Sequence, residues 1–462
     1  MPNAKLTMRI PNRLPRWLDA LWLALLTVYI LAGVAIVPFH GDESTLLFMG
    51  RDYHYLFVEG DLSKVLYDRA TVRNDVEQRL RLENGTISKT IYGWLAWNLG
   101  YGLDDFNKQW HWGLDYASNS MTNRVPEPQL LDAARMTSAV QLALAVILFF
   151  HFVQLTLNRP TAYLASALFA LHPNVLINGR RAMMEGSHLL GLMLVLLAGA
   201  WLLRERRWWA HAVFGVCMGF AVAAKHPNII VCALVYLALL LATLRQQRRE
   251  KNPVLETVWR ERAVFILSPV FAALAFLLLN PAWWSAPFEL PSVIIGMRAD
   301  LLRSQVDWFG GYNSFEQGLQ GFFQYVFAGE HQYFEVDRWA QFDVITAQIQ
   351  KYERSGLAGS LIGGTGLAGL LCLLLALLGL VILARGSAIQ ADSRILLLVW
   401  ILGSALVTLA VTPLPWARYY LPLAPALAIL ASVALLALAS SLWNRSKSRS
   451  AAATRIHHTH TE

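Results

Sequence analysis

Long runs of apolar residues divide this sequence, and they restrict its fold more than any other feature. The chain of 462 residues is 56% hydrophobic and 15% charged, whereas a soluble protein carries roughly a quarter charged residues. Since a helix needs about 20 apolar residues to cross a bilayer, the runs predict an all-α polytopic membrane protein with about ten (roughly 9–12) transmembrane helices. The predicted spans are 17–38, 137–157, 161–178, 184–203, 209–224, 226–244, 263–283, 361–384, 394–412 and 417–442.

Short basic segments beside these runs indicate how the chain is oriented. Lys and Arg are frequent before the first span, in the connections 204–207, 245–262 and 385–394, and after the last span. Cytoplasmic loops of membrane proteins carry an excess of these residues. Ten spans and a cytoplasmic N-terminus would place every one of these segments in the cytoplasm. The sequence therefore predicts an integral protein of the inner or plasma membrane with both termini in the cytoplasm.

Two long segments then face the opposite, outer side of the membrane. We name them the first outer segment, 39–134, and the second outer segment, 284–360. Apolar stretches within them, such as 90–100 and 318–327, predict short helices lying along the interface. The predicted division of the chain is a cytoplasmic N-terminus (1–16), a transmembrane module that includes the first outer segment (17–283), the second outer segment (284–360), C-terminal transmembrane helices (361–442) and a cytoplasmic tail (443–462).

The placement of residues disfavours nucleic-acid binding and a metal site. The net charge is +8, but many of the cations lie in short loops where membrane orientation explains them, so we expect no nucleic-acid partner. Cys217, Cys232 and Cys372 lie within apolar blocks, which is typical of small buried hydrophobic residues. His40 and His54 have no tight ligand spacing with Asp42, and no metal site is predicted.

Charged residues gather at the span ends on the outer side. Asp42 and Glu43 follow the first span directly, and Arg135 precedes the second. Ionisable residues at the membrane boundary are costly and tend to mark functional sites. Converging cations suit a phosphate group, and a carboxylate among them suits a general base that removes a hydroxyl proton. The remaining candidates at the outer connections are Arg180, Arg181, Glu185, Lys225, His226, Arg418 and Tyr419.

Each of these residues also has a purely structural interpretation. Asp42 and Glu43 alone are typical of a solvated exit from the membrane, and Arg135 of a side chain that extends its charge to the interface. Glu185 is spaced to pair on a helix with Arg181, four residues earlier. Lys225 suits the anchoring of a helix end. The functional interpretation depends on all the charged residues sharing one face.

Five short motifs follow one another along these outer connections. They are "GDES" (41–44), "DAARMTSAV" (132–140), "HPNVLINGRRAMMEG" (172–186), "GFAVAAKHPN" (219–228) and "RYYLPLAPALAIL" (418–430). In their order along the chain and their shared side of the membrane, the motifs resemble the membrane-embedded glycosyltransferases of the GT-C superfamily. The resemblance is strongest to the bacterial relatives of protein O-mannosyltransferases and lipid A aminoarabinose transferases. The resemblance covers mainly residues 17–245, with a further match at 413–428.

This resemblance implies an inverting transfer from a sugar carried on polyprenyl phosphate, without a required metal or other cofactor. It implies that Asp42 is the catalytic base and that Glu43 supports it. Stabilising the departing phosphate is electrostatic preorganisation, often the largest contribution to catalysis. The residues implied to bind the donor phosphate are Arg135, Arg180, Arg181, Lys225 and Arg418, with Glu185, His226 and Tyr419 in support.

Two features depart from the family pattern. Many relatives have a proline-containing stretch in the first outer loop, where this chain has "SKTIYGWLAWNLG" (88–100) without proline. Glu185 stands where aspartate is usual, which lengthens the side chain by one methylene. Both departures concern the acceptor site and its geometry.

The sequence therefore predicts a glycosyltransferase that moves a hexosyl or pentosyl group from a lipid-linked donor to a hydroxyl of a glycan, lipid or protein on the outer face. The partners are the bilayer and the polyprenyl-phosphate sugar. A transporter or flippase of a lipid-linked substrate is the alternative, although transporters hold their charged groups near the midplane rather than at span ends. A non-catalytic membrane scaffold is the third interpretation.

Overall fold

A computed structural model describes residues 15–459 of the chain apart from 73, 206, 249–254, 330, 360–364 and 388, and the side chains of 255–264 and 445–459 are outside it. Every regular element in these ranges is a helix, which confirms the predicted all-α class. The long helices are α1 (Trp17–Ala32), α7 (Pro128–Thr156), α10 (Glu185–Leu202), α11 (Trp208–Ala224), α12 (Asn228–Gln247), α13 (Leu255–Leu279), α18 (Gly366–Arg385), α19 (Ala391–Val411) and α20 (Ala424–Thr459).

Shorter helices connect the long ones. In the first outer segment they are α2 (Gly41–Phe48), α3 (Arg51–Tyr53), α4 (Val76–Glu83), α5 (Thr86–Asn98) and α6 (Tyr116–Met121). In the second they are α14 (Leu290–Phe309), α15 (Phe315–Phe322), α16 (Asp337–Ala340) and α17 (Asp343–Arg354). Further short helices are α8 (Arg159–Ala170), α9 (Pro173–Arg180) and the 3-10 helix η7 (Ala417–Leu423), which leads into α20.

Seven helical stretches of the described chain are long and apolar enough to cross a membrane, as an integral membrane protein requires. They are Trp17–Ile36, Pro128–Thr156, Glu185–Leu202, Asn228–Gln247, Gly366–Arg385, Ala391–Val411 and Ala417–Asn444. Two shorter apolar helices, Trp208–Ala224 and Phe265–Leu279, join them. Every predicted span except 161–178 therefore overlaps an apolar helix.

The predicted span 161–178 is not one helix. The chain forms α8 up to Ala170 and starts again as α9 at Pro173. Proline disfavours the helical conformation in the residue before it, and His172 is extended at φ −67° and ψ 122°. The break was hidden because apolar residues stand on both sides of His172 and Pro173 and read as a continuous run.

The bundle is built around α7, which packs against α1, α8 and α10. Its buried side chains include Phe149 and Phe152, which belong to one apolar core with Leu192 and Leu196 of α10. The two helices approach closely at Gly186, where an added Cβ would lie 2.5 Å from the carbonyl oxygen of Ser138. This close packing fixes the start of α10 relative to the start of α7.

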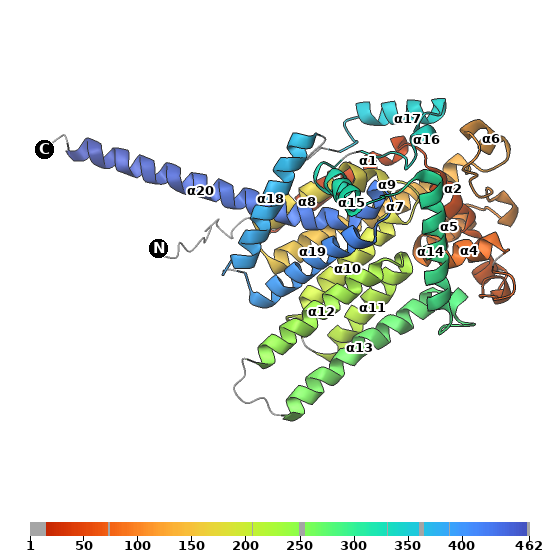
Figure 1. The fold of residues 1–462 in the computed structure, drawn as a ribbon, viewed down its shortest axis with the longest axis horizontal. Coiled ribbons are helices and arrows are strands. Elements are labelled where there is room, and N and C mark those ends of the chain that lie inside the picture. Colours follow the sequence, from red (N-terminus) through yellow and green to blue (C-terminus); the bar gives the residue numbers. More distant parts are fainter. Residues whose placement is uncertain are drawn as a thin grey trace.

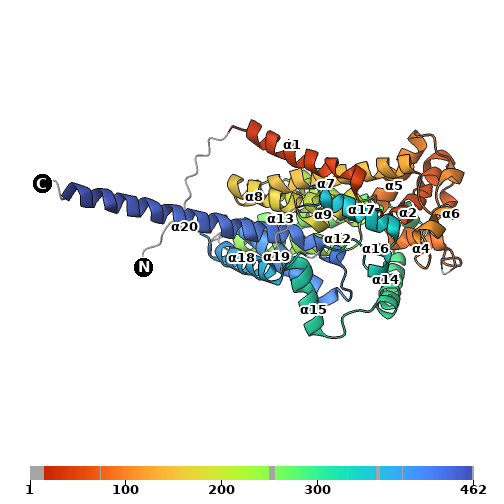
Figure 2. The same cartoon turned by 90° about the horizontal axis from the view of Figure 1, so that it is seen from above.

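The two outer segments pack together at one end of the bundle. Both views show α2, α4, α5 and α6 at the same end as α14, α16 and α17, while α20 extends the opposite way (Figures 1 and 2). The rings of Trp112 and Trp339 lie 4.2 Å apart between centroids. The backbone N–H of Phe39 donates to Gln348 Oε1 at 2.8 Å. Segments almost 300 residues apart in sequence therefore form one end of the molecule.

Candidate active site

The carboxylates of Asp42 and Glu43 lie in the first turn of α2, and they point into different surroundings. His40 caps this helix, because its Nδ1 accepts a hydrogen bond from the Asp42 backbone N–H at 3.1 Å. Glu43 reciprocates by accepting the backbone N–H of His40 at 2.9 Å, which completes a capping box. The Asp42 side chain remains 24% exposed, whereas that of Glu43 is 0% exposed.

All the acceptor positions of Glu43 are occupied by protein donors. Arg135 donates through Nε to Oε1 at 2.7 Å and through Nη2 to Oε2 at 2.8 Å. The Ala182 backbone N–H adds a bond to Oε1 at 2.8 Å. Burial alone would raise the pKa of the Glu43 carboxyl, but Arg135 and Ala182 outweigh it and hold the pKa below its usual value. Glu43 is therefore a fixed anion that has no room to accept a proton.

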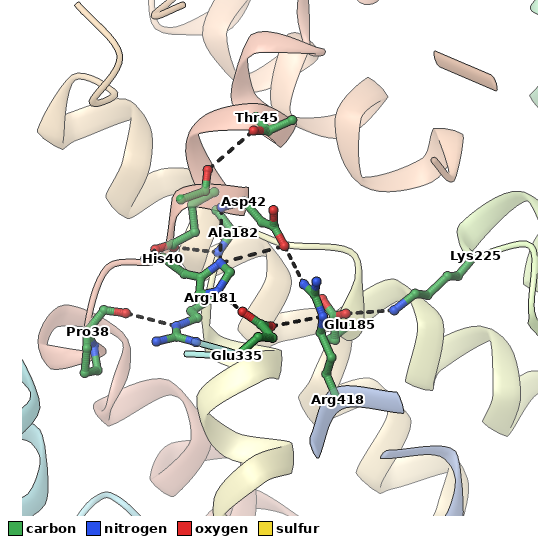
Figure 3. Close-up of polar contacts among 12 residues, drawn as sticks. Pro38, His40, Asp42, Thr45, Arg181, Ala182, Glu185, Lys225, Glu335 and Arg418 are labelled. Carbon is green, nitrogen blue, oxygen red and sulfur yellow. Dashed lines mark hydrogen bonds and ion pairs between the residues drawn. The ribbon is translucent and has the colours of Figure 1, made fainter. Parts of the chain in front are cut away.

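Asp42 belongs to a second network that joins three distant parts of the chain. Its Oδ2 accepts a hydrogen bond from Arg418 Nη1, and the two side chains point toward each other in Figure 3. Arg418 Nε also lies 3.0 Å from Oε1 of Glu335, in the second outer segment. Glu335 Oε2 lies 3.0 Å from His40 Nε2. Because His40 Nδ1 accepts from Asp42, the imidazole proton is on Nε2 and is donated to Glu335.

Lys225 and Glu185 form a neighbouring ion pair. Lys225 ends α11, Glu185 begins α10, and Nζ lies 2.8 Å from Oε1. Figure 3 shows Lys225 reaching Glu185 from the side opposite Asp42. The interpretation that Glu185 pairs with Arg181 on one helix is wrong, because the chain is extended at Arg181 and α10 begins only at Glu185. Lys225 keeps 16% of its side chain exposed and Arg418 keeps 17%.

Arg180 lies apart from these networks. Its guanidinium donates to the carbonyl oxygens of Ile30, at 2.8 Å, and of Tyr29, at 2.6 Å, at the end of α1. It also donates to the Tyr352 hydroxyl at 2.7 Å and to the Leu357 carbonyl. Arg180 is fully buried, so in this structure it ties α9 to α1 and to the second outer segment.

Arg181 is also buried, but it lies between the two networks. Its Nε donates to the Pro38 carbonyl at 3.0 Å, and its Cζ lies 5.5 Å from the centre of the Phe334 ring. Burial lowers the pKa of the Arg181 guanidinium to about 10, against the influence of Glu43 and Glu335. Arg181 therefore remains a cation at neutral pH and balances the two carboxylates without contacting either as an ion pair.

The predicted supporting residues His226 and Tyr419 have aromatic neighbours. The His226 ring lies 6.4 Å from Phe276 and 6.5 Å from Trp283, and both ring nitrogens are buried without a hydrogen-bond partner. Burial lowers the pKa of His226 to about 4. Tyr419 stacks on Trp416 at 5.5 Å. Tyr419 also lies beside the network, with Arg418 Cζ 6.0 Å from the centre of its ring, whereas His226 makes no hydrogen bond with any charged residue of the networks.

Sequence reasoning missed two groups of buried charges. Glu335 stands in "YFEVDRW" (333–339), where a carboxylate next to aromatic residues was the available signal. Asp52 is buried between Arg81, with Nη2 at 2.7 Å, and Lys89, with Nζ at 2.9 Å. This triad joins α3, α4 and α5 and stabilises the first outer segment beside the site. Across the described ranges, no group of three or more His, Cys, Asp or Glu side chains is arranged to hold a metal ion.

Part of the sequence matches a protein-family model, and the fold is similar to a solved structure. Residues 85–292, somewhat less than half of the chain, match the family model described as dolichyl-phosphate-mannose-protein mannosyltransferase. The matched region contains Arg135, Glu185 and Lys225 but neither Asp42 nor Arg418.

A solved structure similar to this chain is that of ArnT from Cupriavidus metallidurans bound to undecaprenyl phosphate. The similarity has a TM-score of 0.50 at 14% identity and covers 91% of this chain and 60% of ArnT. The chain thus spans about three fifths of the length of that protein. No curated protein matches the sequence. The family model and the ArnT structure confirm the resemblance that the sequence motifs indicated. The ArnT structure also supports the fold.

Proposed function

We propose that this protein is a glycosyltransferase that transfers a sugar from polyprenyl phosphate to an acceptor hydroxyl at the outer face of the membrane. The observation that carries the proposal is the pairing of Asp42 with Arg418. A partly exposed carboxylate lies against a partly exposed guanidinium, which also contacts Glu335 of the second outer segment. The reaction needs a general base beside the acceptor oxygen and a cation beside the leaving phosphate, on the two faces of one anomeric carbon, so both groups must belong to one site.

In this mechanism Asp42 removes the proton from the acceptor hydroxyl as its oxygen attacks the anomeric carbon. The bond between that carbon and the phosphate oxygen breaks on the opposite face of the carbon, so the configuration of the anomeric carbon inverts. The electron pair of that bond leaves with the polyprenyl phosphate, and the proton remains on Asp42. Cations that contact the phosphate stabilise its growing negative charge, which is the electrostatic part of catalysis.

The geometry divides the predicted phosphate ligands into two sets. Lys225 contacts one carboxylate and Arg418 contacts two, and both cations keep a partly exposed surface, so a phosphate is able to compete for them. Arg135, Arg180 and Arg181 are buried, and each donates to protein acceptors. We therefore assign direct donor binding to Arg418 and Lys225, and assign the three buried arginines to holding the site.

The proposal includes the location and the acceptor class predicted from the sequence. The catalytic end faces outward and the termini lie in the cytoplasm, as the distribution of basic loops favours. The acceptor is a hydroxyl of a glycan, a lipid or a protein. The family model and the GT-C type fold support a lipid-linked donor.

The deciding experiment uses purified protein and a panel of polyprenyl-phosphate sugars, with release of polyprenyl phosphate as the readout. Asp42→Asn is expected to lower the turnover number by about 10²–10⁴-fold, because the amide is not a base. Asp104→Asn, an exposed carboxylate of the same outer segment, is the matched control. Full activity of Asp42→Asn, with unchanged thermal unfolding, would remove Asp42 from the role of base.

A further inference from the structure

Glu335 holds a place that the proposed reaction does not yet explain. It comes from the second outer segment, about 290 residues after Asp42 in the chain, and its side chain is 8% exposed. Both its oxygens face groups of the candidate active site, Oε1 toward Arg418 Nε and Oε2 toward His40 Nε2, each at 3.0 Å. Burial would raise the pKa of this carboxyl, but Arg418 and His40 hold the pKa well below its usual value.

The contact with His40 controls the orientation of Asp42. The Glu335 carboxylate accepts the Nε2 proton, which leaves Nδ1 free of a proton and able to accept the Asp42 backbone N–H. Phe334, the residue before Glu335, stacks on the His40 ring with 4.8 Å between centroids. Two adjacent residues of the second outer segment therefore fix both the plane and the tautomer of the residue that caps α2.

The contact with Arg418 controls the partner of Asp42. The separation of Nε and Oε1 is 3.0 Å, but the N–H does not point along this line, so the contact is an ion pair rather than a hydrogen bond. Nη1 of the same guanidinium binds Asp42. Arg418 is thus shared by two carboxylates, one from each outer segment, and only Asp42 is substantially exposed.

We propose that Glu335 is a positioning residue for the transfer reaction, which holds Arg418 by Nε while Nη1 moves from Asp42 to the carrier phosphate. The inference rests on the proposed function. In the free protein Arg418 occupies Oδ2 of the base. When a phosphate takes over Nη1, Asp42 is released beside the acceptor, and Glu335 prevents Arg418 from leaving the site. Binding of the donor and release of the base are then one event.

An amide at position 335 cannot replace the carboxylate. The carboxylate accepts the His40 N–H with one oxygen and faces the Arg418 cation with the other, whereas an amide has one oxygen and one NH₂ group. If the oxygen faces His40, the NH₂ group faces the Arg418 cation. If the amide is flipped, the NH₂ group faces the Nε2 proton of His40. Glu335→Gln therefore loses one contact without changing the size of the side chain, and Glu335→Asp keeps two acceptors on a shorter stem.

The experiment compares Glu335→Gln and Glu335→Asp with the natural protein. We expect Glu335→Gln to raise the KM for the polyprenyl-phosphate donor and to lower kcat, each by about tenfold, as the loss of a charge-assisted contact implies. Glu335→Asp should recover part of both effects. Glu316→Gln, an exposed carboxylate of the same segment, is the control and should leave both constants unchanged.

Two outcomes would overturn the inference. If Glu335→Gln lowers kcat only in proportion to the folded fraction, with an unchanged donor KM, Glu335 is merely structural. If Glu335→Gln behaves like Glu316→Gln, it has no role in the site.

A binding arm separates this inference from the proposed function. Undecaprenyl phosphate is titrated against the same purified proteins, and binding is followed by the rise in thermal unfolding temperature. If the natural protein transfers no sugar, the proposed reaction fails, but a weaker binding of undecaprenyl phosphate by Glu335→Gln would still support the positioning of Arg418. Equal binding by Glu335→Gln and the natural protein would overturn it.

Discussion

Glu43 accepts both forks of the Arg135 guanidinium, at 2.7 and 2.8 Å, while the neighbouring Asp42 faces the partly exposed Arg418. Two adjacent carboxylates therefore have separate tasks. One is buried and fully hydrogen-bonded, and it joins α2 to α7 and to the turn at Ala182. The other keeps an exposed surface where an acceptor is able to approach. This division supports the proposal that Asp42 carries out the chemistry while Glu43 maintains the geometry of the site.

Breaking the buried pair of Glu43 and Arg135 should above all lower the free energy of unfolding. Glu43→Gln leaves the Arg135 charge buried without its anion, and loss of one partner of a buried pair costs about 3–5 kcal/mol. We expect a matching fall in the free energy of unfolding, measured with denaturant on detergent-solubilised protein. Glu43→Gln combined with Arg135→Met should be less destabilised than Glu43→Gln alone, because no uncompensated charge remains. Natural stability with a selective loss of turnover would instead make Glu43 a direct participant.

Arg180 provides a test of which arginines contact the donor. Arg180→Lys keeps the charge but cannot reach the carbonyls of Tyr29, Ile30 and Leu357 together with the Tyr352 hydroxyl. We expect a loss of at least about 2 kcal/mol in the free energy of unfolding, since buried acceptors lose their donors. The donor KM of the folded protein should change little. Arg303→Lys, an exposed arginine of α14, serves as the control, and a donor KM raised tenfold by Arg180→Lys alone would return Arg180 to the phosphate site.

The sequence allowed the fold class, and the gathering of charged residues at one end of the bundle, to be predicted for clear physical reasons. Apolar runs long enough to span a bilayer are written directly in the chain, and basic loops mark one side of it. From those two patterns Asp42 and Arg418 were predicted to lie at one end of the bundle, although 375 other residues separate them in sequence. The break at His172–Pro173 was missed because an apolar run does not reveal where a helix stops.

The partners of the site residues were harder to predict. A sequence shows that Arg135, Arg180 and Lys225 are cations near span ends, but their partners depend on the packing of helices. Arg135 meets Glu43 because α7 passes α2, and Lys225 meets Glu185 because α10 and α11 are neighbours. Glu335 was missed because it lies in a non-helical stretch before α16, where the sequence gives no signal for how the second outer segment packs on the first.

Acid should destabilise the outer end of the molecule. Burial opposes ionisation of Glu43, Asp52 and Glu335, but their basic partners hold each pKa below its usual value in the folded protein. A carboxyl with a lowered folded pKa stabilises the protein above its unfolded pKa of about 4, and this stability is lost as the pH falls below that value. The free energy of unfolding should therefore be nearly constant from neutral pH to about pH 5 and fall steeply below it. A Glu43→Gln variant should show a shallower fall, and equal slopes would contradict this assignment.

The contact between Lys225 and Glu185 allows a prediction for Glu185→Asp, which introduces the residue that is usual at this position in the family that the motifs resemble. Glu185→Asp shortens the side chain by one methylene and removes the 2.8 Å contact with Lys225 Nζ unless the helices move. Since Lys225 is proposed to bind the donor phosphate, we expect a freer Lys225 and a donor KM altered by about three- to tenfold. Lys225→Gln should raise the donor KM and abolish any further effect of Glu185→Asp. Additive effects in the double variant would show that the two residues act independently.

The orientation of the bundle is open to a direct labelling test. Position 205 lies in a basic connection assigned to the cytoplasm, and position 313 lies in the second outer segment, so Glu205→Cys and Asn313→Cys should report opposite faces. Asn313 is preferred to the nearby Gly310, because Gly310 has φ +76°, which strains any other residue. Cys217, Cys232 and Cys372 are buried or half-buried and should be replaced by alanine before labelling. In intact cells a membrane-impermeant maleimide should label position 313 and reach position 205 only after lysis. Labelling of both positions in intact cells would contradict the proposed topology, and with it the outward-facing site.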